Sequence, residues 1–126
     1  MNKKLIHQRQ RQLRGNLREK NLDALLLTKV ENVRYLTNFS GHDSWALLAA
    51  NTCLLITDSR YGEQARGECI GCRILQRKEA IAKALAMQVE RLGRIRKIAV
   101  EQTVSAATLG RIRKALRPLK VSAQPV

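Results

Sequence analysis

The sequence of 126 residues predicts a single α/β domain in which helices flank one mixed β-sheet. Three observations lead to this fold class. Short apolar runs of strand length alternate with longer segments of helical periodicity. Two of these runs are adjacent and predict a β-hairpin. The chain is long enough to bury one hydrophobic core, whereas two independent domains are disfavoured, so residues 1–126 are expected to form one domain.

The first expected elements are a helix, a strand and a second helix. Residues 3–20 predict a basic helix, because four apolar side chains can share one face while arginines lie elsewhere. These apolar side chains are Leu5, Ile6, Leu13 and Leu17. The run at 23–27 predicts a buried strand. Thr28 and Glu31 have the spacing of a capping box, which predicts a short helix that extends through Leu36.

A loop and a hairpin follow, and the alternation then continues along the chain. The loop at 38–44 is rich in turn-forming residues. The elements expected after it are a hairpin of 45–50 and 52–57, helix 60–68, strand 72–75, helix 78–92, strand 98–100, a helix with Leu109, Ile112 and Leu116 on one face, and a strand or linker at 120–126. We expect Asp58 or Ser59 to cap the first of these helices, Ser105 to cap the last, and Gly93 to end the middle one.

Composition bears on the compartment and the partners. The 24 Lys and Arg residues against 10 Asp and Glu give a net charge of +14, which suggests an acidic partner: nucleic acid, an anionic membrane or an acidic protein surface. No apolar run approaches the roughly 18 residues of a membrane span, and the basic N-terminus lacks the apolar segment of a secretory signal. Three cysteines without framework spacing fit a reducing cytoplasm. A cytoplasmic protein without a membrane partner is therefore expected.

Three basic segments have the charge to bind phosphate groups, at 3–20, 91–97 and 111–117. Nucleic-acid binding would be helped by interleaved aromatic side chains or a recognised module, and the sequence has neither. Solvated helix faces, or a docking surface for an acidic domain, are therefore favoured over nucleic acid.

Cys69 and Cys72 form a C-x-x-C sequence between the end of a predicted helix and the start of a strand. A redox pair normally lies at a helix start, where the helix dipole lowers the pKa of a thiol. A structural zinc site would need a second pair of ligands, and Cys53, His42 and His7 lack the spacing. Ordinary buried or partly buried cysteines are favoured.

His42 and Asp43 are candidates for metal ligands or for an acid–base pair. Adjacent side chains rarely point at one ion, and no further cluster supports them, so a polar loop is favoured. The same loop, with Phe39 and Ser40, could instead line the active site of another domain. The sequence contains no nucleophile elbow, glycine-rich phosphate loop, HExxH motif or carboxylate pair, and so shows no catalytic apparatus of its own.

Three segments can be considered together: LDALLLT at 22–28, ENVRYLTNFSG at 31–41 and LLITDSRYGEQA at 54–65. In this order and spacing they closely resemble the N-terminal domain of the Xaa-Pro aminopeptidase, prolidase and creatinase group. The resemblance covers essentially the whole chain. It implies a mixed sheet flanked by helices, as in the N-terminal domain of creatinase.

The resemblance also implies a second domain. Full proteins of the group pair this domain with a C-terminal "pita-bread" catalytic domain, whose metal ligands are two Asp, one His and two Glu. The divalent metal (Mn, Co or Zn) is expected there, with no cofactor in this chain. This sequence stops before that domain would begin, and residues 121–126 resemble the segment that leads into the linker between the two domains.

The function implied by the resemblance is that of a non-catalytic N-terminal domain of a metal-dependent Xaa-Pro aminopeptidase or dipeptidase. The domain would contribute to dimerisation and substrate access, with its own catalytic domain, a second copy and a peptide substrate as partners. Two alternatives are a basic module that binds nucleic acid or an acidic protein, and the N-terminal domain of a creatinase-like amidinohydrolase.

In the family, the Asp-Ser-Arg-Tyr segment ends a strand near the active-site cleft, and in several members its arginine reaches a substrate, often in the neighbouring subunit. That role maps to Arg60, whose planar, permanently charged fork suits a carboxylate. Tyr61 is expected to pack beside it and Asp58 to orient it. An equally weighted interpretation is that Asp58 and Ser59 only cap a helix and that Arg60 pairs with a local carboxylate.

The loop from Phe39 to Ser44, including His42, is expected to overhang the same cleft. Two features depart from the family pattern. Asn38 stands where glycine is common, which would stiffen the loop, and the high positive charge is not a family hallmark.

Overall fold

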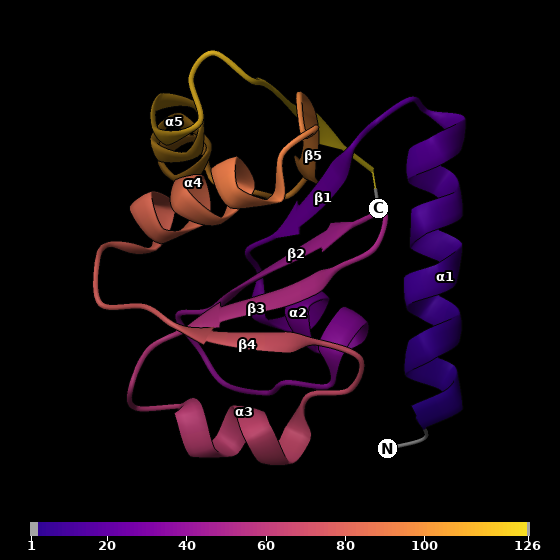
Figure 1. Ribbon diagram of the computed structural model, residues 1–126, viewed down its shortest axis with the longest axis vertical. Helices are drawn as coiled ribbons and strands as arrows, with labels where there is room; N and C mark the ends of the chain where they lie inside the picture. The colour runs from indigo at the N-terminus through magenta and orange to yellow at the C-terminus, as the bar shows by residue number, and fades with distance from the viewer. Residues whose placement is uncertain (1–2, 126) are drawn as a thin grey trace.

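Helices and strands alternate along the chain and build one six-stranded mixed sheet with helices on both faces (Figure 1). The computed structural model describes residues 3–125, so Val126 of the predicted last segment lies outside the described residues. The elements are α1 Lys3–Glu19, β1 Ala24–Leu27, α2 Val30–Thr37, β2 Trp45–Ala49, β3 Cys53–Thr57, α3 Gly62–Glu68, β4 Arg73–Gln76, α4 Ile81–Leu92, β5 Lys97–Glu101, α5 Ala106–Ala115 and β6 Lys120–Gln124. The predicted fold class is confirmed.

The core consists of two apolar layers, one on each side of the sheet. Successive strand side chains point to opposite faces, so Leu26 and Leu47 pack with α4 and α5, whereas Leu25 and Leu48 pack with α1, α2 and α3. Every residue of β1, β2 and β3 is buried, as expected for strands that are covered on both faces. The centre of the sheet is therefore a firm support for the loops at its edges.

Of the six strands that the structure describes, β2 alone runs against the others. Across the sheet the order is β4-β3-β2-β1-β5-β6. The pairs of β2 with β1 and β3 are antiparallel, and the remaining three pairs are parallel. The carboxyl ends of five strands therefore share one edge of the sheet, where β2 begins. In α/β sheets, loops at such an edge are the usual place for a ligand site.

Helix α1 packs with an apolar stripe inward and one polar residue within that stripe. Leu17 is buried, whereas Leu5, predicted on the same face, is exposed. Gln10 fills the gap in the apolar pattern. Its side chain is 3% exposed and donates to the carbonyl oxygens of Leu36 (3.1 Å) and Ile70 (3.0 Å). One amide group thus joins α1 to α2 and to the segment before β4.

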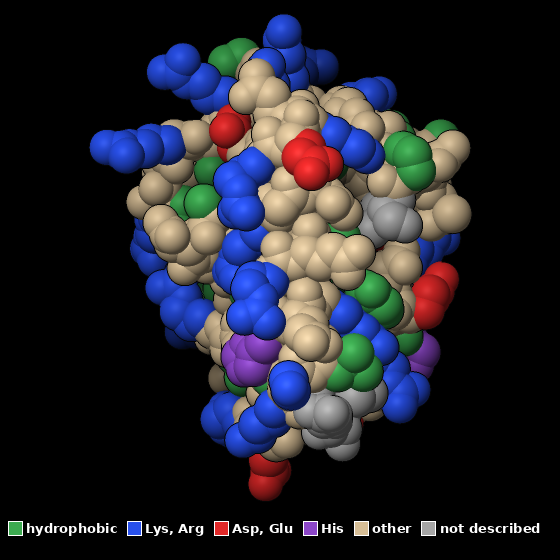
Figure 2. All heavy atoms as spheres, turned by 90° about the vertical axis from the view of Figure 1, so that its right-hand side faces the viewer, with side chains coloured by type: hydrophobic (Ala, Val, Ile, Leu, Met, Phe, Trp, Pro, Cys, Tyr) green, Lys and Arg blue, Asp and Glu red, His purple; other side chains and the backbone are tan. Residues whose placement is uncertain are grey.

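The outer face of α1 is basic. Figure 2 shows Lys and Arg side chains spread along this face, with few acidic ones. The sequence places Tyr35 away from the basic runs, but the fold brings the Arg9 guanidinium to 4.2 Å from the centre of its ring. As for membranes, none of the helices within residues 3–125 has the length and apolar character needed to span one.

The capping box predicted at Thr28 and Glu31 is wrong. The N-cap of α2 is Lys29, and it makes no side-chain cap bond. Instead, one carboxylate oxygen of Glu101, at the end of β5, accepts hydrogen bonds from the backbone N–H groups of Thr28 (2.6 Å) and Lys29 (2.7 Å) and from the Thr28 hydroxyl (2.7 Å). A negative group suits the positive end of a helix, so the cap comes from a neighbouring strand.

Two other helices begin later than the sequence pattern indicates. α3 begins at Gly62, and neither Asp58 nor Ser59 caps it, because the Asp58 carboxylate binds the backbone N–H of Arg60 instead. α4 begins at Ile81, after an extended Ala80.

Two predicted helix ends are confirmed. The Ser105 hydroxyl accepts a hydrogen bond from the backbone N–H of Thr108 at the start of α5 (3.1 Å). α4 ends at Gly93, which has a φ of 65°, in the left-handed region that glycine adopts at little cost.

Candidate functional site

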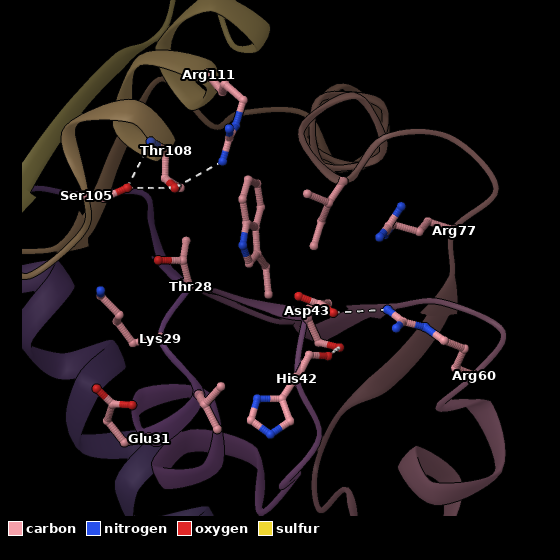
Figure 3. Close-up of a pocket in the computed structure, with 14 residues that line it drawn as sticks. Thr28, Lys29, Glu31, His42, Asp43, Arg60, Arg77, Ser105, Thr108 and Arg111 are labelled. Atoms are coloured by element: carbon pink, nitrogen blue, oxygen red, sulfur yellow. Dashed lines mark hydrogen bonds and ion pairs between the residues drawn. The ribbon is translucent and has the colours of Figure 1, made fainter.

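A cavity of about 640 Å³ opens at the carboxyl edge of the sheet (Figure 3). Its walls come from the loops after β1, β3, β4 and β5 and from the start of β2. The basic side chains that line it are Lys29, Arg60, Arg77 and Arg111. The acidic ones are Glu31 and Asp43. The lining therefore carries a net positive charge, which favours an anionic ligand.

Arg60 lies in the turn that follows β3, and two carboxylates hold its guanidinium. Nε donates to Asp58 at 3.1 and 3.3 Å, and Nη2 donates to Asp58 at 2.7 Å and to Asp43 at 3.1 Å. The Arg60 side chain is nevertheless 60% exposed. Asp58 holds the Arg60 guanidinium, as expected, and the arginine also pairs with the local carboxylate of Asp43.

The Arg60 pair fixes the charge state of the site. The hydrogen bond from Arg60 holds the pKa of Asp58 below its ordinary value of 3.8. The same bond raises the pKa of Arg60. Arg77 adds a second positive charge, with Nη2 at 3.7 Å from Asp58. The carboxylate and the guanidinium are therefore both ionised throughout the physiological range.

Tyr61 and Phe39 form an aromatic pair that packs beside Arg60. The Arg60 guanidinium carbon lies 5.1 Å from the centre of the Tyr61 ring. Tyr61 meets Phe39 edge-on, with ring centres 5.9 Å apart. Phe39 has no exposed surface, so in this structure it acts through Tyr61 rather than facing the cavity. Gly41 packs against both rings where a Cβ atom would collide.

The loop at 38–44 is tied to the end of α3. One Glu68 carboxylate oxygen accepts from the backbone N–H of Ser40 (2.8 Å) and from its hydroxyl (3.0 Å), and the Asn38 amide donates to the Glu68 carbonyl (3.0 Å). Burial raises the pKa of Glu68, but the hydrogen bonds from Ser40 and Gln64 outweigh it, and the pKa is lowered overall. Asn38 adopts a φ of 71°, a left-handed conformation that asparagine tolerates better than most residues.

His42 and Asp43 stand at the exposed tip of this loop and both line the cavity. Asp43 turns toward Arg60, and its side chain is 64% exposed. Below them, the Ser44 hydroxyl bonds the His42 carbonyl oxygen (2.9 Å) and the Thr57 hydroxyl (2.8 Å). The loop is thus fixed at both ends, with its two titratable side chains at the opening.

The opposite wall of the cavity was not found from the sequence. Lys29 follows β1, and Thr108 and Arg111 lie in the first turns of α5, after β5. Arg111 Nη2 donates to the Thr108 hydroxyl (3.2 Å), which also bonds Ser105 (2.9 Å). Their place in the chain could have identified these residues, because each of them follows a strand that ends at the same edge of the sheet.

The described residues offer no site for a metal ion. Between residues 3 and 125, no group of three or more His, Cys, Asp and Glu side chains has the arrangement needed to hold one. Cys53, Cys69 and Cys72 are free thiols. The net positive lining of the cavity suits an anion, which the planar guanidinium of an arginine can bind through two donors.

A family model for the Creatinase/Prolidase N-terminal domain matches residues 9–125 of the chain. The chain belongs to this family. The matched region of this creatinase/prolidase N-terminal domain includes all six strands and every residue that lines the cavity. Arg60 and its partners are therefore part of the family fold rather than of an appended segment.

Solved structures share this fold. The XXA-pro aminopeptidase from Streptococcus pyogenes superposes with a TM-score of 0.88 at 31% identity, over 96% of this chain and 92% of that chain. The N-terminal domain of the cytoplasmic peptidase PepQ from Mycobacterium tuberculosis H37Rv has a TM-score of 0.79 at 27% identity, over 94% and 92% of the two chains. The Xaa-Pro dipeptidase from Bacillus anthracis gives 0.88 at 30% identity, over 95% of this chain but 34% of that chain.

A curated relative is similar over part of its length. The uncharacterized peptidase YqhT of Bacillus subtilis (strain 168) is 33% identical over 90 residues, which is 71% of this chain and 25% of that protein. The chain therefore spans about a quarter of the length of the curated relative that it matches.

Proposed function

We propose that this domain is the non-catalytic N-terminal part of a metal-dependent Xaa-Pro aminopeptidase or dipeptidase, and that it contributes to substrate access and dimerisation. Its membership of the creatinase/prolidase family and its similarity to chains named as Xaa-Pro peptidases support the proposal. The observation that carries it is the cavity at the carboxyl edge of the sheet, which presents an exposed, oriented Arg60.

In this proposal, Arg60 binds a carboxylate of the peptide substrate. The Asp58 carboxylate accepts hydrogen bonds from Nε and Nη2 of Arg60, whereas Asp43 is exposed and makes a single contact with Arg60. A substrate carboxylate would displace Asp43 and keep the contact with Asp58, because the displaced side chain can return to water. Tyr61 and His42 would lie beside the bound peptide, and Phe39 would keep Tyr61 in place.

The chemistry belongs to a C-terminal catalytic domain that we expect beyond residue 126. A divalent Mn, Co or Zn ion in that domain would activate the water that attacks the bond before proline. The residues described here would supply binding and orientation alone. We further propose that the whole protein works in the cytoplasm as a homodimer, in which Arg60 acts in its own subunit or across the interface.

The first experiment is to read the gene beyond the codon for Val126 and to express the complete chain. With an Xaa-Pro peptide and Mn²⁺, Arg60→Ala should raise KM at least tenfold, the loss of about one charge-assisted contact. Arg66→Ala is the matched control, because Arg66 is an exposed arginine of α3 that does not line the cavity. The 126-residue chain alone should show no hydrolysis with Mn²⁺ or Co²⁺.

Two results would overturn the proposal. Equal KM values for the Arg60→Ala and Arg66→Ala enzymes would remove Arg60 from substrate binding. Metal-dependent hydrolysis by the 126-residue chain would show that the domain is catalytic by itself.

A further inference from the structure

Two free thiols meet on the face of the sheet that packs against α1, α2 and α3. The Sγ atoms of Cys53 and Cys72 lie 3.1 Å apart. Cys53 begins β3, and Cys72 directly precedes β4. In the parallel register of these strands, Leu54 lies opposite Arg73, so the two cysteines are opposite neighbours on adjacent strands.

The surroundings hold this pair in contact. Cys53 is 4% exposed within the core, and Cys72 is partly buried against the same cluster. The Cys72 thiol also contacts the Ile70 carbonyl oxygen (3.3 Å), which in turn accepts a hydrogen bond from Gln10 (3.0 Å). The segment before β4 is therefore fixed from two sides, and the thiols approach each other without any movement of the strands.

We propose that Cys53 and Cys72 are a modification site, and that a small-molecule disulfide such as oxidised glutathione converts them into an intramolecular disulfide while Cys69 stays reduced. A disulfide needs an S–S distance of about 2.05 Å, so the sulfur atoms must close by about 1 Å. Among the described residues, Cys53 is the thiol in contact with Cys72. The C-x-x-C sequence by itself points instead to the pair of Cys69 and Cys72.

The reaction proceeds by two exchanges. The thiolate of Cys72, the more exposed of the pair, attacks oxidised glutathione, forms a mixed disulfide and releases one glutathione thiolate. The Cys53 thiolate then attacks the Cys72 sulfur and releases the second glutathione. The two protein thiols lose two electrons and two protons in total, and one glutathione disulfide becomes two glutathione molecules.

The environment makes this reaction slow at neutral pH. The hydrogen bond with Cys53 and burial raise the pKa of Cys72, so little thiolate is present. Burial also raises the pKa of the Cys69 thiol, to about 12. Formation of the disulfide should therefore accelerate as the pH rises from 7 to 9, as expected for thiolate attack.

The bond would close a ring around the Arg60 turn. The chain from Cys53 to Cys72 contains β3, the turn at 58–61 and α3. A cross-link over about 20 residues removes conformations from the unfolded chain. The oxidised protein should therefore unfold at a temperature roughly 10 °C higher than the reduced protein.

The test is to incubate the 126-residue chain with oxidised glutathione at pH 8, alkylate it, digest it with trypsin and analyse the peptides by mass spectrometry. Trypsin cuts after Arg60 and Arg66 and so separates Cys53 from the peptide that holds Cys69 and Cys72. The expected result is one linkage between these two peptides, present in Cys69→Ser and absent in Cys72→Ser. Cys53→Ala gives the same loss if it folds, and Cys72→Ser suffices if it does not.

Three outcomes would overturn the proposal. They are loss of the linkage in Cys69→Ser, its persistence in Cys72→Ser, and the recovery of intermolecular or glutathionylated species alone. The melting temperature of each oxidised sample, with and without a reductant, provides the second readout.

Discussion

Arg60 and Asp58 show what local sequence can predict about single residues. The resemblance of TDSRYG to the family implied an arginine at a strand end that Asp58 orients, and the structure joins the two side chains by three hydrogen bonds. The partner Asp43 lies in another loop, and nothing in the local pattern identifies it. Glu101 was missed for the same reason, because it caps α2 from 73 residues away in the sequence.

Asp58 gives the domain a defined sensitivity to acid. Its pKa is lowered in the folded protein, so its contribution to stability is complete above the ordinary, unfolded value of 3.8 and is lost as the pH falls through the lower, folded value. Asp58→Asn should therefore lower the unfolding temperature at pH 7, and the difference from the unaltered chain should shrink as the pH falls toward about 3. Thermal unfolding at both pH values measures this.

The control for Asp58 is Glu90→Gln, since Glu90 is exposed and lies outside the cavity. A difference between Asp58→Asn and the unaltered chain that stays constant or grows toward acid pH would show that Asp58 does not act through its charge.

Glu101 is 1% exposed, and one of its two carboxylate oxygens carries three hydrogen bonds. Glu101→Ala leaves those donors without a partner and should lower the free energy of unfolding by about 3 kcal/mol. Glu101→Gln keeps an acceptor oxygen and should cost less than the alanine variant. Urea denaturation measures both, with the exposed neighbour Gln102→Ala as control. An equal loss in both Glu101 variants would contradict the capping role.

At the scale of elements, apolar patterns and capping signals predicted the helices and strands of the described chain, with the last segment left as a strand or linker, and they failed at several helix starts. Helix α2 begins later than expected because its start is held by Glu101 from β5. Helices α3 and α4 also begin later, and no side chain caps either of them. Ser105 was predicted correctly because its cap is local. Element boundaries are therefore predictable where the capping group lies within one turn of the helix.

Helix α1 depends on one polar side chain that the apolar pattern treated as a gap. Gln10→Ala removes the hydrogen bonds to Leu36 and Ile70 and should lower the free energy of unfolding by about 2 kcal/mol. Gln8→Ala removes an exposed glutamine from the same helix and should change it by less than about 0.5 kcal/mol. Chemical denaturation of the two variants compares them directly, and equal effects would contradict the role of Gln10.

For the whole molecule, the resemblance to the family predicted the architecture, whereas the position of the cavity required the strand order. Sequence alone does not bring Arg111 of α5 near Arg60 of the turn after β3. The sheet does so, because both follow strands that end at the same edge. Long-range placement of this kind depends on pairings between distant strands, which no local pattern encodes.

The net charge of +14 should make stability depend on salt. The described residues include ion pairs of Arg60 and Arg77 with Asp43 and Asp58, and the basic face of α1 is exposed to solvent (Figure 2). Raising NaCl from about 10 mM to about 200 mM screens the repulsion among the excess Lys and Arg side chains of the domain. The unfolding temperature should therefore rise by a few degrees. Sodium sulfate at equal ionic strength separates screening from anion binding. A constant or falling temperature in NaCl would contradict this account.

Because β2 runs opposite to the other five described strands, the cavity and the turn between β2 and β3 lie at opposite ends of the sheet. Because β2 begins beside the cavity, its turn into β3, around Asn51, lies at the opposite end of the sheet and is exposed. A fluorescent probe or an affinity tag inserted at Asn51 would thus be separated from Arg60 by the full length of a strand. Asn51 is therefore a position at which the domain can be immobilised or labelled without altering the cavity that Arg60 lines.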